Sequence, residues 1–386
     1  MSEGLMLPLE ELMAKRAGSV DPSKFPEEQF DLYSIPAFDK GCHEVVAGSE
    51  IGSTKQVVEP NDVLLSKIVP HIRRSWVVGQ SNGRRMIASG EWIVFRSNKI
   101  APAYLRHVLV STPFHAQFMQ TVSGVGGSLL RARPAQVAKI RIPLPPLPEQ
   151  RRIAAILDQA DALRAKRREA LAQLDDLPQA VFGEMFGDAQ TIHERWPVRP
   201  LGDMLDFLTS GSRGWAEYYA ETGALFLRIQ NVCRDELDLT DVAFVSAPDS
   251  AEARRTEVRE GDVLLSITAD LGRTAVIPPG IGKAHINQHL SILRTKAVNP
   301  RYLSAFIASP AGQREVMGRN KQGVKAGLNF DDIRSFRIPV PPNSLQQEFV
   351  TRADEIGRQL KTHRQSLIVL DSLFASLQHR AFRGEL

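Results

Sequence analysis

The sequence predicts an α+β protein with two mixed α/β domains in tandem, each followed by a long helix of coiled-coil type. The first observation is a proline-rich lead-in that occurs twice, as RIPLPPLPEQ at 141–150 and as RIPVPPNSLQQEF at 337–349. The second is the apolar spacing of three and four that follows each lead-in. The third is that the segments before the two lead-ins resemble each other.

The first long helix is predicted to begin at Glu149, because the prolines before it lack amide donors and hold the chain extended. Its expected seam, with Arg167 as the one polar break, comprises Ile153, Ile156, Ala160, Leu163, Ala170, Leu174, Leu177 and Val181. Pro178 predicts a bend or restart, with Asp176 as its cap. Gly183 and Gly187 are expected to close the helix.

The second long helix follows the lead-in at the C-terminal end. Its expected seam, with His363 as the polar break, comprises Phe349, Ala353, Ile356, Leu360, Leu367, Leu370, Phe374, Leu377 and Ala381. Because such a seam needs a partner helix, we expect the two helices to pair with each other. Either helix alone would also fit a core helix or a homodimer helix.

The repeat extends through both domains. The matching pairs are Asp62-Val-Leu-Leu-Ser66 with Asp262-Val-Leu-Leu-Ser266, Tyr104-Leu105 with Tyr302-Leu303, Thr112-Pro113 with Ser309-Pro310, Gly124-Val125 with Gly323-Val324, Arg141-Ile-Pro143 with Arg337-Ile-Pro339, and Phe182 with Phe382. The chain is therefore predicted to be a tandem duplication of a unit of roughly 190 residues.

Each domain is predicted to hold short strands, one helix and a polar glycine-rich loop. The expected strands are 30–35, 63–65, 92–95, 225–229, 242–245, 263–267 and 290–293. The expected helices are 102–120 and 300–317, each with proline in its first turn. The loops are 123–128 and 321–327.

Composition indicates a cytoplasmic globular protein of two or three domains. The 386 residues are 43% hydrophobic and 24% charged, with no apolar run long enough to span a membrane. The N-terminal sequence lacks the apolar core of a secretory signal. Two cysteines, Cys42 and Cys233, argue against a disulfide framework or a zinc site. A net charge of +4 and a pI near 9.1 permit nucleic-acid binding.

The sequence contains no recognisable catalytic or metal-binding constellation. Asn299-Pro-Arg-Tyr302 superficially resembles the NPPY motif of adenine methyltransferases, but the repeat aligns it with Ala101-Pro-Ala-Tyr104. No glycine fingerprint or P-loop is present. We therefore predict a binding and positioning component that has no enzymatic activity, metal or cofactor of its own.

The duplicated set of motifs resembles the specificity subunit of type I restriction–modification systems. The matching stretches are RIPLPPLPEQRRIAAILDQADAL, QAVFGEMFGD, RIPVPPNSLQQEF, HRAFRGEL, DLYSIPAFD, FLRIQNV and GDVLLSITADLGRT. The resemblance implies two target-recognition domains separated and joined by two long antiparallel coiled-coil helices with pseudo-twofold symmetry. The implied boundaries are 1–148 and 188–345 for the domains, and 149–187 and 346–386 for the helices.

The resemblance also implies partners. They are double-stranded DNA, read as a split sequence with one half per domain, two adenine methyltransferase (modification) subunits that carry S-adenosylmethionine, and restriction motor-nuclease subunits. No membrane partner is implied. A helix of about 35 residues is roughly 50 Å long, enough to hold two readers one DNA turn apart, which is roughly 34–36 Å.

Candidate DNA-binding residues are Arg, Lys, Asn, Gln and Ser/Thr side chains in loops after strands. They are Lys67, Arg73, Arg74, Asn82, Arg84, Arg85 and Ser128 in the first domain and Ser212, Arg213, Arg228, Asn231, Thr268, Arg273, Asn287, Gln288, Lys321 and Lys325 in the second. A single arginine of this set is more often a solvated surface charge.

Arg164 and Arg168 on the first long helix are expected to point outward, toward a modification subunit or DNA phosphates; a solvated helix face explains them equally well. The alternative for the whole chain is a non-catalytic scaffold whose coiled coil spaces two protein-binding domains. Such a scaffold would show no salt-dependent, sequence-selective DNA binding.

Overall fold

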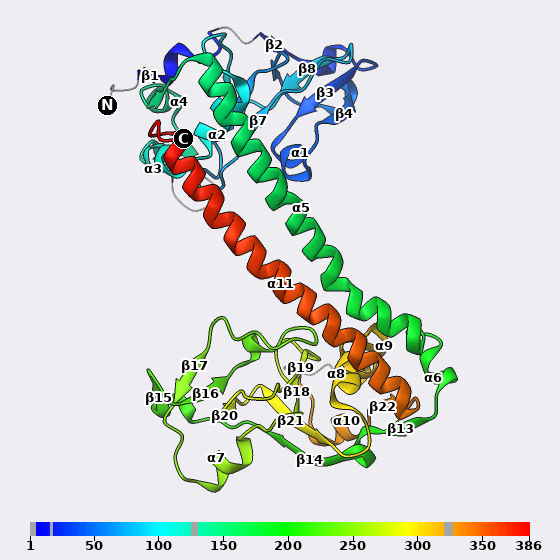
Figure 1. The fold of residues 1–386 in the computed structure, drawn as a ribbon. Helices are drawn as coiled ribbons and strands as arrows, with labels where there is room; N and C mark the ends of the chain where they lie inside the picture. Colours follow the sequence, from blue (N-terminus) through cyan, green and yellow to red (C-terminus); the bar gives the residue numbers. More distant parts are fainter. Residues whose placement is uncertain (1–4, 16–17, 125–129, 320–326) are drawn as a thin grey trace. The chain divides into compact units, whose positions relative to one another are not determined.

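The protein was analysed as a computed structural model, which describes residues 5–15, 18–124, 130–319 and 327–386. It divides into two compact units. Unit 1 comprises Met1–Arg168 and Gln365–Leu386, and unit 2 comprises Glu169–Arg364. The division runs through both long helices, α5 (Leu147–Phe186) and α11 (Asn343–Ala381), so each unit contains part of both (Figure 1).

Unit 1 is built on two sheets. The strands of one sheet, in the order β7-β6-β9, are Ser75–Val77, Val63–Ser66 and Trp92–Phe95. Those of the other, in the order β2-β5-β8-β3-β4, are Ser19–Val20, Lys55–Val57, Arg85–Ala88, Gln29–Tyr33 and Glu44–Ala47. The strand β6 of the DVLLS motif is buried throughout, because a central strand is covered on both faces.

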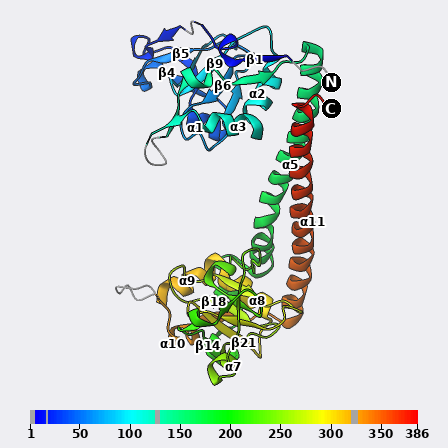
Figure 2. The same ribbon diagram turned by 90° about the vertical axis from the view of Figure 1, so that its left-hand side faces the viewer.

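The helices and short strand pairs of unit 1 complete its main core. They are β1 (Met6–Pro8) with β12 (Arg141–Pro143), β10 (Val122–Ser123) with β11 (Arg131–Ala132), α1 (Ile35–Lys40), α2 (Pro102–Leu109), α3 (Thr112–Met119) and α4 (Pro134–Val137). The main core of this unit joins α2 and β6 to residues of α5 and α11 (Figure 2).

Unit 2 repeats this plan. One sheet, in the order β14-β21-β18-β19, is formed by Leu205–Ser210, Leu290–Thr295, Val263–Ser266 and Thr274–Val276. A second, in the order β15-β17-β16-β20, is formed by Tyr219–Ala220, Ala243–Val245, Ala224–Leu227 and Ala284–Ile286. The remaining elements are α6 (Ile192–Arg195), α7 (Ala251–Thr256), α8 (Pro300–Ala308), α9 (Pro310–Arg319), α10 (Phe330–Arg334) and the pair β13 (Val198–Pro200) with β22 (Arg337–Pro339).

The repeat is built from matching polar contacts. Buried Asp62 is held by Arg96 with two bonds of 2.7 and 2.6 Å, and buried Asp262 by Arg294 with two of 2.7 Å. Each aspartate also accepts a backbone N–H three residues before it, which is why the motif begins with Asp.

A second matching contact fixes the start of each long helix. Gln150 accepts from the N–H of Ala101 at 2.7 Å, and Gln346 accepts from that of Asn299 at 2.9 Å. Both glutamines are buried, and each donates back to a carbonyl of its own proline-rich lead-in. The glutamine of each lead-in therefore ties the helix to its mixed domain.

The long helices pack antiparallel within each unit. In unit 1, Arg164 of α5 meets Asp371 of α11 at 2.6 Å. In unit 2, Asp175 of α5 meets Arg364 at 3.1 Å, and the rings of Phe182 and Phe349 lie 5.4 Å apart. The predicted seam of α11 is confirmed, because each of its residues is buried or half-buried.

The predicted seam of α5 is partly wrong. Leu163 and Leu177 are 55% and 38% exposed, whereas Leu157, which the prediction omitted, is fully buried. Beyond Leu157 the inward face continues through Arg164 and Leu171. A spacing of three and four therefore persists. Ile153, Ala160, Leu174 and Val181 lie inward as predicted, and the positions between them lie one residue later than predicted.

Three further expectations on helices need correction. Residues 102–120 and 300–317 each form two helices, because Ser111 and Ser309 cap a second helix that has proline in its first turn. The helix α5 runs through Pro178 without a restart, so Asp176 lies inside it. Gly187, at φ +105°, ends it as predicted, but Gly183 lies inside the helix and does not close it. Among the described helices, none combines the length and apolar character that crossing a bilayer requires.

Candidate nucleic-acid interface

Three of the predicted segments of unit 2 come together where strands β14, β18 and β21 end or begin. We call Ser212, Thr268, Asn287, Gln288 and His289 the strand-end cluster. Ser212 forms a parallel bridge with Asn287. The turn beside it needs glycine, because a Cβ on Gly211 would lie 2.1 Å from the Asn287 carbonyl oxygen.

His289 organises the cluster. Its Nδ1 lies 2.5 Å from the hydroxyl of Thr268, and its Nε2 lies 3.2 Å from the amide nitrogen of Gln288. Since an amide nitrogen only donates, Nε2 accepts and Nδ1–H donates to Thr268. The His289 N–H donates to the Asn287 side-chain oxygen at 3.1 Å. The ring thus sets the direction of the Thr268 and Gln288 side chains, and the backbone N–H of His289 sets that of Asn287.

The cluster contacts Gly327, which follows Lys321 and Lys325 in the sequence. Thr268 is bridged to Gly327, and the N–H of Leu328 donates to Ile267 O at 3.0 Å. The two lysines themselves lie outside the described residues, as does Ser128 of unit 1. Asn and Gln present a donor and an acceptor side by side, which is the pattern that reads adenine in the major groove.

Arg213 and Arg273 lie close to this cluster in the sequence but have different surroundings. Arg213 is exposed and lines a cavity of about 280 Å³ together with Trp215 and Tyr218. Arg273 is paired with Asp270. Arg213 is therefore the more accessible of the two.

Arg228 and Asn231 were predicted to read DNA, but in the structure both have structural contacts. Asn231 is buried, accepts the N–H of Arg228 at 2.9 Å and donates to the carbonyls of Asp238 and Asp241. The Arg228 guanidinium donates to Asp241 O at 2.9 Å. The polar groups of this compact turn bond to one another, so residue type alone did not indicate which side chains are free to contact DNA.

The same loop, which follows β16, also contacts helices α8 and α11 of unit 2. Arg234 donates to Ala308 O at 3.0 Å, the hydroxyl of Ser304 donates to Asp235, and Glu236 pairs with Arg364 of α11. Burial raises the pKa of Asp235 to about 6. The loop after β16 therefore ties α8 and α11 to the sheet.

Unit 1 holds most of its predicted arginines in acid pairs. Arg74 is 8% exposed and binds Asp39 through two bonds of 2.7 and 2.8 Å, so its prediction as an open DNA ligand is wrong for this structure. The remaining pairs are Arg84 with Asp31 at 2.6 Å and Arg85 with Glu28 at 2.5 Å. These hydrogen bonds lower the pKa values of Asp39 and Glu28.

The other predicted residues of unit 1 are more open. Arg73 is exposed and donates to Val110 O and the Thr112 hydroxyl at 3.2 and 3.1 Å. Asn82 lies in an exposed turn and accepts the N–H of Arg84 at 3.3 Å. Lys67 is half-buried, directly after β6.

Unit 1 has a counterpart of the strand-end cluster with different chemistry. The N–H of Lys67 donates to Glu91 O at 3.0 Å, as that of Ile267 donates to His289 O at 2.9 Å. Glu91 pairs with Arg131 at 3.2 Å, and Ile68 is bridged to Arg131. Sequence reasoning missed Arg131 and Glu91.

Arg164 does not point outward as predicted. Its side chain is 17% exposed, pairs with Asp161 and Asp371 at 2.9 and 2.6 Å, and lies 4.2 Å from the ring centre of Phe374. Arg168 is half-exposed and also reaches Asp371, at 3.0 Å. The outward residues of α11 in unit 1 include three apolar ones, Ile368, Val369 and Leu373, which are 66%, 67% and 48% exposed.

Metal-ligand chemistry is not assembled in the parts of the chain that the structure describes, where no group of three or more His, Cys, Asp or Glu side chains is placed to hold an ion.

Comparisons with known proteins agree with the fold. The specificity subunit of the type I restriction enzyme EcoKI from Escherichia coli K12 is 30% identical over 291 residues, covering 68% of this chain and 61% of that protein. The EcoBI specificity subunit of Escherichia coli is 24% identical over 281 residues, covering 64% and 58%. The matches thus span less than two thirds of each relative's own length.

Two solved structures resemble the whole chain. One comes from a study of complex assembly and conformational transition in the type I R-M system, with a TM-score of 0.61, 22% identity and coverage of 100% and 99%. The other, the S subunit of a type I restriction–modification system from M. genitalium, has a TM-score of 0.61, 11% identity and coverage of 99% and 97%. These likenesses concern the fold.

The family described as Type I restriction modification DNA specificity domain matches residues 54–173 and 194–371, which is most of the chain and includes parts of both units. The chain therefore belongs to the family of type I restriction–modification specificity subunits.

Proposed function

We propose that the chain is the DNA-reading subunit of a type I restriction–modification complex and that each unit recognises one half of a split sequence. The observation that carries this is that the two units share a framework but differ in the polar residues at their strand ends. Both units keep the buried Asp–Arg pair and the glutamine anchor, yet one presents Thr268, Asn287 and Gln288 where the other presents Lys67 and Arg131.

In unit 2, the ring of His289 orients the Gln288 amide for base contacts, and its backbone N–H orients that of Asn287. An amide bidentate to adenine N6 and N7 is worth about 1–3 kcal/mol of discrimination. In unit 1, Lys67 and Arg131 supply cationic donors, which suit guanine edges or phosphates. The two units would therefore prefer different bases, which gives an asymmetric split sequence.

The partners proposed are double-stranded DNA, two modification subunits that supply S-adenosylmethionine and methylate adenine, and restriction motor-nuclease subunits. The chain itself is proposed to be non-catalytic and cytoplasmic. The exposed residues Ile368, Val369 and Leu373 on α11 support a protein-binding role for the outer helix faces.

The helices are proposed to set the spacing between half-sites. Inserting seven residues into each helix inside its seam would preserve the heptad register and lengthen the pair by about 10 Å. The methylated motif should then gain about three base pairs between its halves, since DNA rises about 3.4 Å per base pair. An unchanged spacer would contradict this role.

The direct test is substitution in the strand-end cluster of unit 2. Co-expressed with a modification subunit, Gln288→Ala should relax one base position in one half of the methylated motif. Exposed Gln230→Ala, in the loop after β16, is the matched control and should leave the motif unchanged. A uniform loss of methylation at all sites would make Gln288 a positioning residue rather than a base reader.

The scaffold alternative predicts a different outcome. A protein-binding spacer would bind DNA without sequence preference or not at all. The DNA reader should instead lose affinity steeply between 50 and 200 mM salt while keeping its preference for one duplex.

A further inference from the structure

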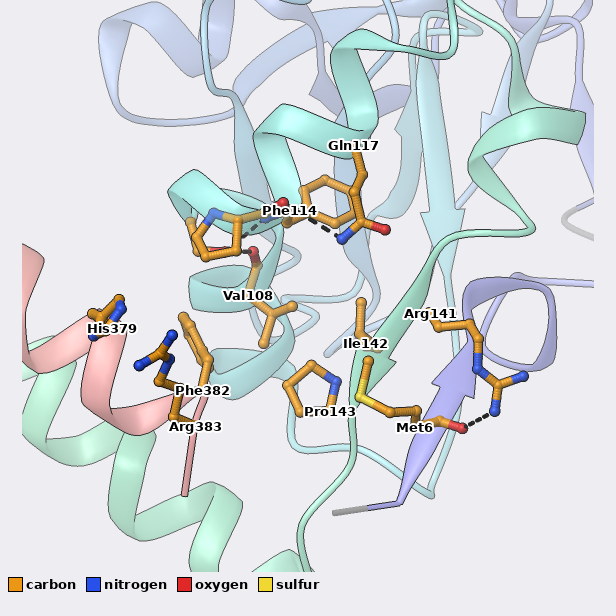
Figure 3. Close-up of a pocket in the computed structure, with 12 residues that line it drawn as sticks. Met6, Val108, Phe114, Gln117, Arg141, Ile142, Pro143, His379, Phe382 and Arg383 are labelled. Carbon is orange, nitrogen blue, oxygen red and sulfur yellow. Dashed lines mark hydrogen bonds between the residues drawn. The ribbon is translucent and has the colours of Figure 1, made fainter. Parts of the chain in front are cut away.

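Unit 1 contains a groove whose lining residues have counterparts in unit 2. The groove encloses about 310 Å³ between α2, α3, β12 and the end of α11 (Figure 3). Its apolar lining comprises Met6, Val108, Pro113, Phe114, Ile142, Pro143 and Phe382. Its polar lining comprises Ser111, Gln117, Arg141, His379 and Arg383. We call it the α2–α11 groove.

The repeat contacts align the groove with a definite place in unit 2. Tyr104 donates to Pro143 O at 3.1 Å, as Tyr302 donates to Pro339 O at 2.8 Å. Phe382 lies 5.9 Å from the Tyr104 ring, as Phe182 lies 5.6 Å from the Tyr302 ring. The residues around Tyr104 beside the groove therefore correspond to those around Tyr302 in unit 2.

The strand registers extend the alignment. Met6 pairs with Pro143 and Pro8 with Arg141, as Val198 pairs with Pro339 and Pro200 with Arg337. Four residues after the two tyrosines, Val108 corresponds to Phe306. The groove positions Val108 and Arg141 are therefore the counterparts of Phe306 and Arg337.

In unit 2 that place is filled by α6. The ring of His193 lies 6.0 Å from the Phe306 ring, nearly perpendicular to it, and its Nε2 lies 3.2 Å from Arg337 O. The preceding residue, Ile192, is fully buried in the unit 2 core. Asp188 caps the turn by accepting the N–H groups of Gln190 and Thr191 at 2.9 Å.

None of the described lining residues of the groove is a counterpart of α6. Its rim is basic: Arg141, His379 and Arg383 are exposed, and no aspartate or glutamate is among the described lining residues. Figure 3 shows His379 and Arg383 rising from α11 beside Phe382. An occupant that carries a carboxylate would therefore be favoured.

We propose that the α2–α11 groove binds a short helical turn of a partner protein that resembles α6. The turn carries one aliphatic side chain for the apolar floor, an adjacent N–H donor for Arg141 O, and a carboxylate for the Arg383 and His379 rim. This site is separate from the strand-end clusters and does not depend on how DNA is read.

The first experiment uses a fluorescent peptide with the sequence of residues 187–197, the occupant of the corresponding place in unit 2. We expect the full-length chain to bind it saturably below about 1 mM. The Ile192→Asp version of the peptide should bind at least about tenfold more weakly, because the aliphatic anchor is lost.

Matched variants of the chain locate the binding. Gln117 lines the groove on the exposed side of α3, so Gln117→Trp should close it and reduce peptide binding at least about tenfold. Ala116→Trp, exposed on the same helix but outside the lining, should bind normally. Similarly, Arg383→Glu should weaken binding and Arg380→Glu should not. Thermal unfolding of all four variants should match that of the parent chain.

The second experiment places a photo-crosslinking amino acid at position 117 in the complex assembled with modification subunits and DNA. A crosslink to a second polypeptide, in a segment with an aliphatic residue next to a carboxylate, is the expected result. A crosslink only to DNA, to another copy of this chain or to its own residues 1–4 would overturn the proposal. So would a peptide that fails to bind, or binding that Gln117→Trp leaves unchanged.

Discussion

The buried Asp262–Arg294 pair offers the sharpest test of the repeated framework. The Asp262 side chain is 1% exposed and accepts three hydrogen bonds of 2.7 Å, two from Arg294 and one from the N–H of Arg259. Asp262→Ala would leave a mostly buried guanidinium and a backbone donor without their acceptor. Breaking such a pair from one side costs about 3–5 kcal/mol.

That cost is a large fraction of the stability of one domain, which is typically about 5–15 kcal/mol. For a domain of this size, 1 kcal/mol shifts Tm by about 2–4 °C, so the unit 2 transition should fall by about 6–20 °C. Thermal unfolding followed by hydrogen exchange would assign the loss. Protection should fall in β18 and β21 of unit 2 but stay unchanged in β6 and β9 of unit 1.

A matched control is available in the same sheet. Asp206 lies 3.8 Å from Lys296, and both side chains are at least half exposed. An exposed pair contributes only about 0–1 kcal/mol, so Asp206→Ala should shift Tm little. If Asp262→Ala and Asp206→Ala destabilise the protein equally, the buried carboxylate does not anchor the unit as described.

Three other predictions follow from burial and titration. Leu157→Ala, at a fully buried position of α5, should destabilise unit 1 by about 2–5 kcal/mol in denaturant unfolding. Leu163→Ala, at a 55% exposed position, should be nearly neutral. A larger loss for Leu163→Ala would favour the predicted seam over the observed one. Burial raises the pKa of Asp235 from 3.8 to about 6, so stability is lost as pH rises through that interval. Asp235→Asn should therefore stabilise unit 2 by about 3 kcal/mol at pH 7 and by nothing near pH 3.5. Equal effects at both pH values would contradict this. Burial lowers the pKa of His285, so below about pH 6.5 the unfolded chain binds a proton more readily than the folded one, and the free energy of unfolding decreases as pH is lowered. His285→Phe should reduce the slope of that free energy against pH in urea titrations between pH 7.5 and 5.5. An unchanged slope would exclude this histidine as its source.

The sequence predicted the two long helices and the strands β3, β6, β9, β16, β17, β18 and β21 because these depend on local signals, but it missed the other strands. The antiparallel pairing of the helices was implied by the family resemblance. Prolines, capping residues and the spacing of apolar residues act over a few positions. Strand β9, for example, spans Trp92–Phe95 as expected. The error in the α5 seam arose because Ile156 and Leu157 are both apolar, and only packing against α2 and α11 decides which one faces inward.

The DNA-contact predictions were harder because they depended on residue type. An arginine in a loop is equally suited to a phosphate and to a carboxylate of its own chain. Arg74 and Asp39 are 35 residues apart in the sequence, so their pairing could not be read from local spacing. By contrast, Thr268, Asn287 and Gln288 were placed correctly in loops after or before strands, and the structure brings them together around His289.

The most direct measurement is the methylated motif, read by long-read sequencing, in a host that expresses this chain with the proposed modification subunit. The parent chain should give a split, asymmetric adenine-methylation motif. Exchange of residues 205–336 for those of another family member should change one half of that motif and leave the other half intact. A motif that changes in both halves, or one that is continuous, would contradict the assignment of one half-site to each unit.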